Sequence, residues 1–350
     1  MSAARLAIYA LTAPGAETAR RLARAWPHAR LFLPWRLARA EQGEQGFKRL
    51  ADRLAGNFNS YDGHLLFAAA GIVVRALAGL MQSKDIDPAV VVADPAGRYV
   101  VSLLAGHLGG ANDLAVEAAR HLGGQAVITT ATDNAGVPSL EMVAAGQGLR
   151  VENLKALARI SRRLVEAEPV ALYDPENWLW PALAGYEEHF IRQEKPSATE
   201  PAVWVDWRAK ETHAPWLVLR PACLTAGMGC NRDTSAQEMH ELLERVFAEN
   251  GLAPGSLLCL ATVEAKRDEA GLAELANSLQ TNIRFYPAAR LDGVDVPHPS
   301  PAAAKHIGTK SVCEAAALMA ASAEQLLVTK QKSKNATLAV AKLKRPAASS

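Results

Sequence analysis

The sequence predicts an α/β protein with mainly parallel sheets. Apolar strand-like runs alternate with helical patterns over about the first 137 residues and again from about residue 216, which is typical of doubly wound sheets. The stretch between them lacks clean periodicity and carries several tryptophans and prolines. We therefore expect an N-terminal doubly wound domain (1–137), a small irregular middle domain (138–215), a C-terminal α/β domain (216–341) and a basic, disordered tail (342–350).

The N-terminal elements follow from the spacing of apolar residues and from the glycines and prolines between them. Strands are expected at residues 5–11, 30–33, 65–69, 89–92, 100–104 and 126–128. Helices are expected at 16–25, at 44–56, from 71 onward, and from about Asn112 to Leu122. Asp94-Pro95-Ala96-Gly97 is a hairpin-type turn.

The later elements are predicted in the same way. The middle segment has a mostly helical stretch at 143–167 and a strand at 170–172. Its tryptophans are more often core residues than ligand platforms. The C-terminal domain has strands at 217–219, 223–226, 257–263 and 336–340, helices at 236–250, from 272 and at 315–321, and a glycine turn at 227–230.

Composition excludes several classes of protein. The net charge is +2, which argues against nucleic-acid binding by neutralisation of phosphates. No run approaches eighteen apolar residues, so we expect no transmembrane helix. The four cysteines are scattered, without CxxC spacing, which predicts neither a zinc site nor disulfides and fits the cytoplasm.

The stretch 101–133 carries the chemistry. Its two polar clusters, Gly106-His107-Leu108-Gly109-Gly110 and 129–134, each follow an apolar strand, and one helix joins them. In open α/β sheets, ligands bind outside the carboxyl ends of strands. His107 there is a candidate general base at neutral pH; the alternative is a loop histidine that hydrogen-bonds the backbone.

The neighbours of His107 supply donors and acceptors. Asn112 either orients His107 or binds substrate, or it only caps the helix. Hydroxyls and a carboxylate follow the next strand at Thr129, Thr130, Thr132 and Asp133. The same residue types also occur in ordinary turns.

A second cluster lies in the C-terminal domain. Gly227 and Gly229 form a glycine turn before a helix that Ser235 can cap. The turn has neither GK[ST] nor the third glycine of GxGxxG, so a carboxylate is a better ligand than a nucleotide. Glu264 and Lys266 are either part of this site or a solvated loop. Cys230 has no histidine nearby in sequence, so we do not expect it to be a nucleophile.

Several segments together resemble one family, the cobalamin biosynthesis protein CbiG, a cobalt-precorrin-5A hydrolase. The segments are GIVVRALA (71–78), K-DIDPAVVV (84–92), SLLAGHLGGAND (102–113), TTATDN (129–134), GMGCNRDTS (227–235), ATVEAKRDEAGL (261–272) and SVCEAAAL (311–318). The second half alone is similar to a small stand-alone homologue of the aerobic pathway. The acidic Asp233 beside Arg232 and the basic tail depart from the family pattern.

The resemblance implies a reaction. The family is expected to open a δ-lactone of cobalt-precorrin-5A by hydrolysis and to release acetaldehyde, giving cobalt-precorrin-5B. That chemistry assigns catalysis to His107, Asp133 and Thr130, with oxyanion donors from Thr129, Thr130 or the backbone near Gly109 and Gly110. Carboxylates of the macrocycle would be held by Arg75, Lys84, the 227–230 turn and Lys266; the full set of substrate-binding candidates is Arg75, Lys84, Gly109, Gly110, Asn112, Thr129, Thr132, Gly227, Gly229, Glu264 and Lys266.

The resemblance implies no cofactor and no metal ligand in the protein, since cobalt arrives inside the substrate. Expected partners are the corrinoid and, transiently, other enzymes of the cobalamin pathway. Two other functions stay open: a non-catalytic carrier of corrin intermediates, which would not need the His107–Asp133 pair, and a nucleotide-dependent enzyme that uses the 227–230 turn.

Overall fold

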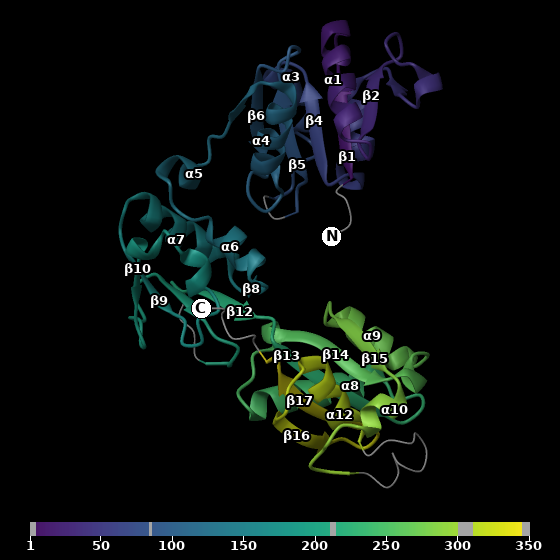
Figure 1. The fold of residues 1–350 in the computed structure, drawn as a ribbon, viewed down its shortest axis with the longest axis vertical. Helices are drawn as coiled ribbons and strands as arrows, with labels where there is room; N and C mark the ends of the chain where they lie inside the picture. The colour runs from purple at the N-terminus through teal and green to yellow at the C-terminus, as the bar shows by residue number, and fades with distance from the viewer. Residues whose placement is uncertain (1–4, 84–85, 211–214, 300–310, 345–350) are drawn as a thin grey trace. The chain divides into compact units, whose positions relative to one another are not determined.

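The computed structural model describes residues 5–83, 86–210, 215–299 and 311–344. These residues form two compact units, 1–142 and 143–350, which are described separately (Figure 1). Lys84 and the end of the predicted tail, residues 345–350, lie outside the described residues.

The first unit is a sheet of strand order β3-β2-β1-β4-β5-β6-β7. Its strands are β1 (Leu6–Ala10), β2 (Arg30–Pro34), β3 (Gln45–Phe47), β4 (Gly63–Phe67), β5 (Ala89–Ala93), β6 (Tyr99–Leu104) and β7 (Gln125–Val127). Its helices are α1 (Ala13–Ala25), α2 (Leu50–Asn57), α3 (Ala70–Leu77), α4 (Ala111–Leu122) and α5 (Ala131–Ala135). Helix α6 (Leu140–Gly146) begins in the first unit and ends in the second.

Helices cover both faces of this sheet, as the sequence predicts for a doubly wound fold. One buried cluster contains Leu22 of α1 and Ala115 of α4, and the cluster on the other face contains Leu54 of α2 and Val73 of α3. The apolar β-strands β4 and β5 are buried along their whole length, because helices cover them on both faces.

The last two strands run against the others. β1 to β5 are parallel to their neighbours, whereas β6 is antiparallel to β5 and pairs Leu104 with Val90. The predicted hairpin turn at Asp94 causes this reversal, and the Tyr99 amide donates to Asp94 Oδ1 at 2.8 Å. β7 is parallel to β6. The carboxyl ends of β6 and β7 therefore lie at the edge of the sheet where β4 and β5 begin.

The second unit contains two sheets. The middle sheet has the order β10-β9-β11-β12-β8, with β8 (Leu149–Val151), β9 (Val170–Tyr173), β10 (Phe190–Arg192), β11 (Ala202–Val205) and β12 (Leu217–Pro221), and helix α7 (Leu154–Val165). The expected irregular middle segment is thus a regular sheet. Its tryptophans are core residues: the rings of Trp204 and Trp216 stack 4.8 Å apart.

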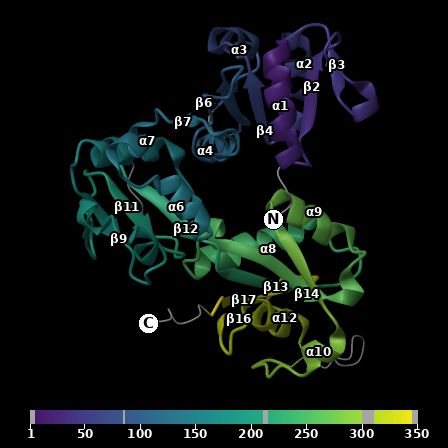
Figure 2. The ribbon, with the colours of Figure 1, turned by 45° about the horizontal axis from the view of Figure 1, so that its top comes forward.

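The C-terminal sheet has the order β15-β14-β13-β17-β16. Its elements are β13 (Leu224–Cys230), α8 (Ala236–Glu249), β14 (Leu257–Val263), α9 (Ala270–Ser278), β15 (Asn282–Tyr286), α10 (Ala288–Asp292), α12 (Val312–Ala321), β16 (Leu326–Lys332) and β17 (Ala336–Lys342). Helices α8 and α9 pack together, and α12 packs against β13, β14 and β17 (Figure 2). Ser235 caps α8 as predicted, accepting from the Glu238 amide at 3.2 Å.

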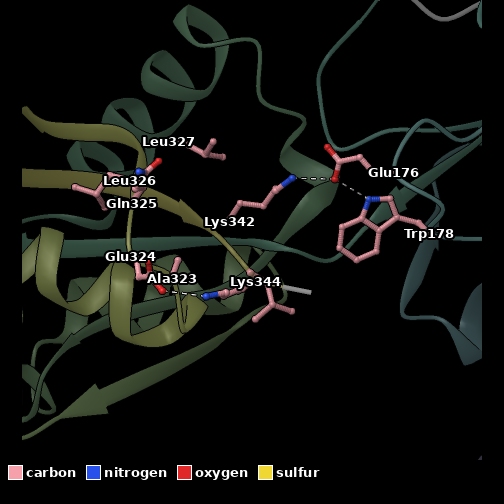
Figure 3. A pocket seen from close by; sticks show the side chains of 10 residues that line it. Glu176, Trp178, Ala323, Glu324, Gln325, Leu326, Leu327, Lys342 and Lys344 are labelled. Atoms are coloured by element: carbon pink, nitrogen blue, oxygen red, sulfur yellow. Dashed lines mark hydrogen bonds and ion pairs between the residues drawn. The ribbon is translucent and has the colours of Figure 1, made fainter. Parts of the chain in front are cut away.

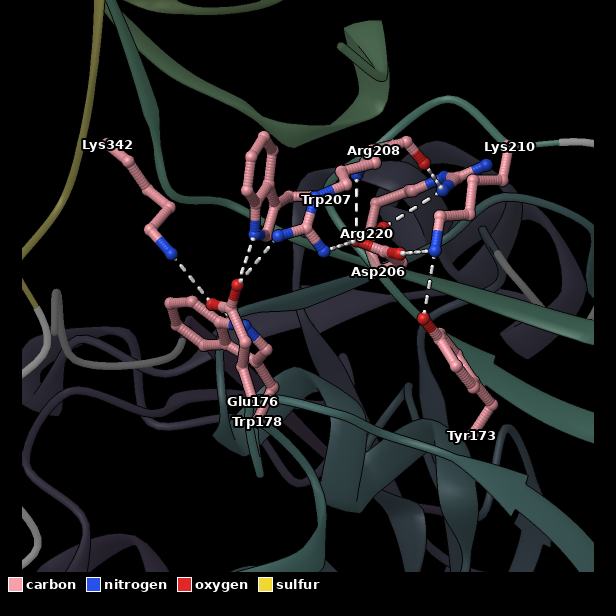
Figure 4. A network of polar contacts seen from close by, with 9 residues as sticks. All are labelled: Tyr173, Glu176, Trp178, Asp206, Trp207, Arg208, Lys210, Arg220 and Lys342. Atoms are coloured by element: carbon pink, nitrogen blue, oxygen red, sulfur yellow. Dashed lines mark hydrogen bonds and ion pairs between the residues drawn. The ribbon is translucent and has the colours of Figure 1, made fainter. Parts of the chain in front are cut away.

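A polar network joins the middle and C-terminal sheets within the second unit. Lys342 Nζ of β17 lies 2.8 Å from Glu176 Oε2, and the Trp207 indole donates to Glu176 Oε1 at 2.9 Å (Figure 4). Buried Arg220 donates to the Asp206 carbonyl at 2.9 Å in the same network. The pKa of the Glu176 carboxyl is lowered: burial opposes ionisation, but Lys342 and Trp207 outweigh it.

Three predictions about elements are wrong. Residues 44–56 are not one helix, because β3 and α2 share them. The strand at 217–219 belongs to the middle sheet, so the two sheets divide between Pro221 and Leu224 and not at residue 216. Residues 227–230 are not a turn but the second half of strand β13, which is paired on both sides by β14 and β17.

Candidate active site

The loop after β6 needs its glycines. Gly110 has φ +84° at the start of α4, a conformation that favours glycine. A Cβ on Gly109 would lie 2.3 Å from Ala105 Cβ and 2.8 Å from the Ala105 carbonyl oxygen. Ala105 itself has φ +55°. This tightly folded loop turns His107 toward the segment after β7.

His107 is held at both ring nitrogens. Nδ1 lies 2.8 Å from Glu141 Oε1, and Nε2 lies 3.0 Å from Asp133 Oδ2. The Thr132 hydroxyl is 3.2 Å from Nε2. The ring is one-fifth exposed, and the two carboxylates differ: the Glu141 side chain is 11% exposed and that of Asp133 is 45% exposed. Two carboxylates stabilise the imidazolium that forms when His107 accepts a proton.

Asp133 is the centre of the exposed half of the site. Its Oδ2 accepts from Asn112 Nδ2 at 3.2 Å and from the Thr130 hydroxyl. Burial raises the pKa of the Asp133 carboxyl, but hydrogen bonds from Thr130 and His107 outweigh this and the net pKa is lowered. Asp133 is therefore ionised at neutral pH.

The structure brings together most of the predicted residues in the first unit. His107, Asp133, Thr130, Thr132 and Asn112 are joined by hydrogen bonds. Thr129 is exposed at the same strand end. Asn112 Oδ1 is buried and has no hydrogen-bond partner among the described residues.

Arg75 does not belong to this cluster. It lies on α3, which follows the carboxyl end of β4, and the site for a Cβ on Gly71 is 3.7 Å from its guanidinium. The side chain thus folds back toward the start of α3. The His107 loop follows β6, which ends at the opposite edge of the sheet. In an all-parallel sheet both side chains would lie at the same edge, but the reversal of β6 places Arg75 and His107 at opposite edges.

The candidates in the second unit have other neighbours. A Cβ on Gly227 would lie 1.8 Å from the Cys313 carbonyl oxygen, so this glycine permits close packing of β13 on α12. A Cβ on Gly229 would lie 2.6 Å from Thr337 Oγ1. Lys266 pairs with Glu269 at 2.8 Å after β14, and Glu264 is exposed beside it. Substrate binding by these four residues stays a prediction.

Sequence reasoning missed Glu141. It lies in the first turn of α6, beyond the boundary that we predicted at residue 137. An acidic residue in a first helical turn is common because it favours the helix dipole. Nothing in the sequence distinguishes Glu141 from such a residue, and the contact with His107 spans 34 positions.

A cavity of about 370 Å³ lies in the second unit (Figure 3). Trp178, Leu326 and two lysines are among the residues that line it. Lys342 pairs with Glu176 at 2.8 Å and Lys344 with Glu324 at 2.9 Å. Because both ammonium groups are neutralised by carboxylates, this cavity offers an anion less than the number of lysines suggests.

Two kinds of feature are absent from the part of the chain that the structure describes. None of their helices is long and apolar enough to cross a membrane. No group of three or more His, Cys, Asp or Glu side chains within 5–83, 86–210, 215–299 and 311–344 is arranged to hold a metal ion.

Comparison with known proteins covers nearly the whole chain. Three family models match in order: Cobalamin synthesis G N-terminal at 52–133, Cobalamin biosynthesis central region at 138–221 and Cobalamin synthesis G C-terminus at 224–341. The chain is 32% identical to a cobalt-precorrin-5A hydrolase of Priestia megaterium, over 96% of this chain and 94% of the relative.

Two further relatives match different lengths of the chain. A cobalt-precorrin-5A hydrolase of Salmonella typhimurium is 32% identical, over 82% of this chain and 83% of the relative. Protein CobE of Sinorhizobium sp is 37% identical over 34% of this chain and 80% of its own length. The chain therefore belongs to the CbiG family of cobalamin biosynthesis proteins.

Proposed function

We propose that this chain is a cobalt-precorrin-5A hydrolase of cobalamin biosynthesis. The observation that carries the proposal is the similarity to relatives of that name over nearly the full length of both chains. The site agrees with it: a histidine between two carboxylates, of which one is mostly buried and one is open, is suited to activate water.

The reaction we propose is hydrolysis of the δ-lactone, with release of acetaldehyde and formation of cobalt-precorrin-5B. His107 takes a proton from the attacking water, and the resulting imidazolium lies between Glu141 and Asp133. The hydroxyl of Thr130 or Thr129, or the backbone N–H groups near Gly109, stabilise the oxyanion on the lactone carbonyl. The ring C–O bond then breaks: the acyl carbon becomes a carboxylic acid, which ionises, and the departing oxygen takes the proton from the imidazolium. Release of acetaldehyde further requires the C–C bond between the freed hydroxyl-bearing carbon and the macrocycle to break. The hydroxyl carbon then becomes the aldehyde, and the ring carbon keeps the electron pair and takes up a proton.

We also propose that cobalt is carried by the substrate and that the protein contributes no cofactor. The substrate's acetate and propionate groups would pair with basic side chains. We place the reaction in the cytoplasm, with transient contacts to other enzymes of the pathway. The carrier alternative is not favoured, since the full-length relatives are named as hydrolases.

The test is anaerobic incubation of the purified chain with cobalt-precorrin-5A, followed by measurement of acetaldehyde and of the mass of the corrinoid. Acetaldehyde together with the matching loss of mass supports the hydrolase. Tight binding of the corrinoid without acetaldehyde would instead support a carrier, and neither binding nor release would refute the proposed substrate.

A further inference from the structure

Glu141 depends on His107 for its hydrogen bonding. Its Oε1 lies 2.8 Å from Nδ1, and its side chain is 11% exposed. The other oxygen, Oε2, is buried and has no hydrogen-bond partner among the described residues. A carboxylate removed from water is costly unless donors satisfy it, so the contact with His107 Nδ1 is the main polar contact that holds Glu141 in place among the described residues.

Asp133 is held differently on the other side of the ring. Its Oδ2 also accepts from Asn112 and Thr130, and its side chain is almost half exposed. Loss of the His107 contact leaves Asp133 with other donors and with water. The Nε2 side of the ring can therefore exchange its partner for a substrate or a water, whereas the Nδ1 side cannot.

We propose that Glu141 is a positioning residue: it keeps a proton on Nδ1 of His107 and so leaves the basic lone pair of the neutral ring on Nε2. There the Thr132 hydroxyl, 3.2 Å away, can donate to it. The contact of Nε2 with Asp133 belongs to the protonated ring, because an ionised carboxylate can only accept. Which ring nitrogen of a neutral histidine lacks a proton is set by the hydrogen bond that the other ring nitrogen makes. The kinetic part of this inference rests on the proposed hydrolase function, but the position of the proton does not.

The proton position is tested on the full chain labelled with ¹⁵N-histidine. The His107 signals are those that disappear in His107→Asn. At a pH where the ring is neutral, we expect Nδ1 to carry the proton in the wild type. In Glu141→Met, which fills the space without an acceptor, we expect this preference to be lost. A proton on Nε2 in the wild type, or an unchanged tautomer in Glu141→Met, would overturn the proposal.

The kinetic test uses Glu141→Gln, which keeps an acceptor oxygen but removes the charge. We expect kcat for acetaldehyde release to fall at least tenfold while KM changes less than threefold. The charged groups in contact with the ring are Glu141 and Asp133.

Glu117→Gln is the matched control. This carboxylate lies on α4 in the same unit, half exposed and 3.8 Å from His121. The control removes the same charge and should leave both kcat and KM unchanged. A lower kcat in Glu141→Gln with the wild-type tautomer of His107 unchanged, or an equal loss in Glu117→Gln, would indicate general structural damage and refute the positioning role. A wild type that releases no acetaldehyde would refute the hydrolase function, while the tautomer would still test Glu141.

Discussion

Gly227→Ala tests whether residues 227–230 form a strand that packs closely against helix α12. Gly227 lies in β13, which is bonded to β14 and β17. An alanine Cβ would lie 1.8 Å from the Cys313 carbonyl oxygen and 2.7 Å from the Ala317 amide nitrogen. Both atoms belong to the backbone of α12, so a side-chain rotation cannot relieve the clash, and α12 must move away from the sheet.

Overpacking of a core costs about 1–3 kcal/mol, and a displaced helix backbone belongs at the upper end of this range. For a unit of 150–250 residues, about 3 kcal/mol corresponds to a fall in Tm of roughly 6–12 °C. Thermal unfolding of the full chain, followed by calorimetry, measures this change in the transition of the second unit.

Gly293→Ala is the control in the same region. Its Cβ would lie 3.6 Å from the Arg290 carbonyl oxygen, which is ordinary contact. We expect its Tm to stay within about 2 °C of the wild type, since a substitution without a clash usually changes stability by less than about 0.5 kcal/mol. If Gly227→Ala unfolds at the same temperature as Gly293→Ala, β13 does not pack on α12 as described.

Three further predictions concern single groups. Arg20 and Glu44 form a buried pair at 2.6 Å, so Arg20→Met should destabilise the first unit by about 3 kcal/mol in urea unfolding. The Arg20 hydrogen bond lowers the Glu44 pKa below 4.5, so the contribution of the pair to stability is present at neutral pH and should be lost as the pH falls below that value. An equal destabilisation by Arg20→Met at all pH values would contradict this. Asp133→Asn should lower kcat about tenfold or more with a smaller change in stability, because Asn112 and Thr130 still contact the side chain; a wild-type kcat would exclude Asp133 from catalysis. Burial raises the pKa of the Cys223 thiol to about 12 and also raises that of Cys230, so both should react slowly with a disulfide reagent at pH 8, and Cys230→Ser should keep its activity; rapid labelling of the native chain would contradict this.

Local sequence patterns were sufficient for most of the first unit. The strands at β1, β4 and β5 and the helix α4 follow directly from apolar spacing and glycine stops. They were predictable because each is decided by its own residues: the strands are covered on both faces, and α4 has one apolar face. β3 was missed because three residues give no periodicity of their own, and pairing with β2 alone makes them a strand.

The candidate site was predictable only where local patterns decide the position of a residue. His107 and Asp133 each lie within a few residues of a predicted strand end, so their positions follow from local structure. The contact of His107 with Glu141 depends on the path of the chain between β7 and α6, which no local pattern specifies. The separation of Arg75 from His107 depends on the reversal of β6. Local patterns do not predict this reversal, since the direction of a strand is set by its connection and not by its composition.

The most direct test of the central claim compares the wild type with His107→Asn in a single turnover of cobalt-precorrin-5A. The asparagine amide can still donate to Glu141, so the buried carboxylate keeps a partner, but no base remains at Nε2. We expect acetaldehyde release to fall about 10²–10⁴-fold, with corrinoid binding changed less than threefold. Release at the wild-type rate by His107→Asn would show that His107 is not the base and that the reacting site lies elsewhere.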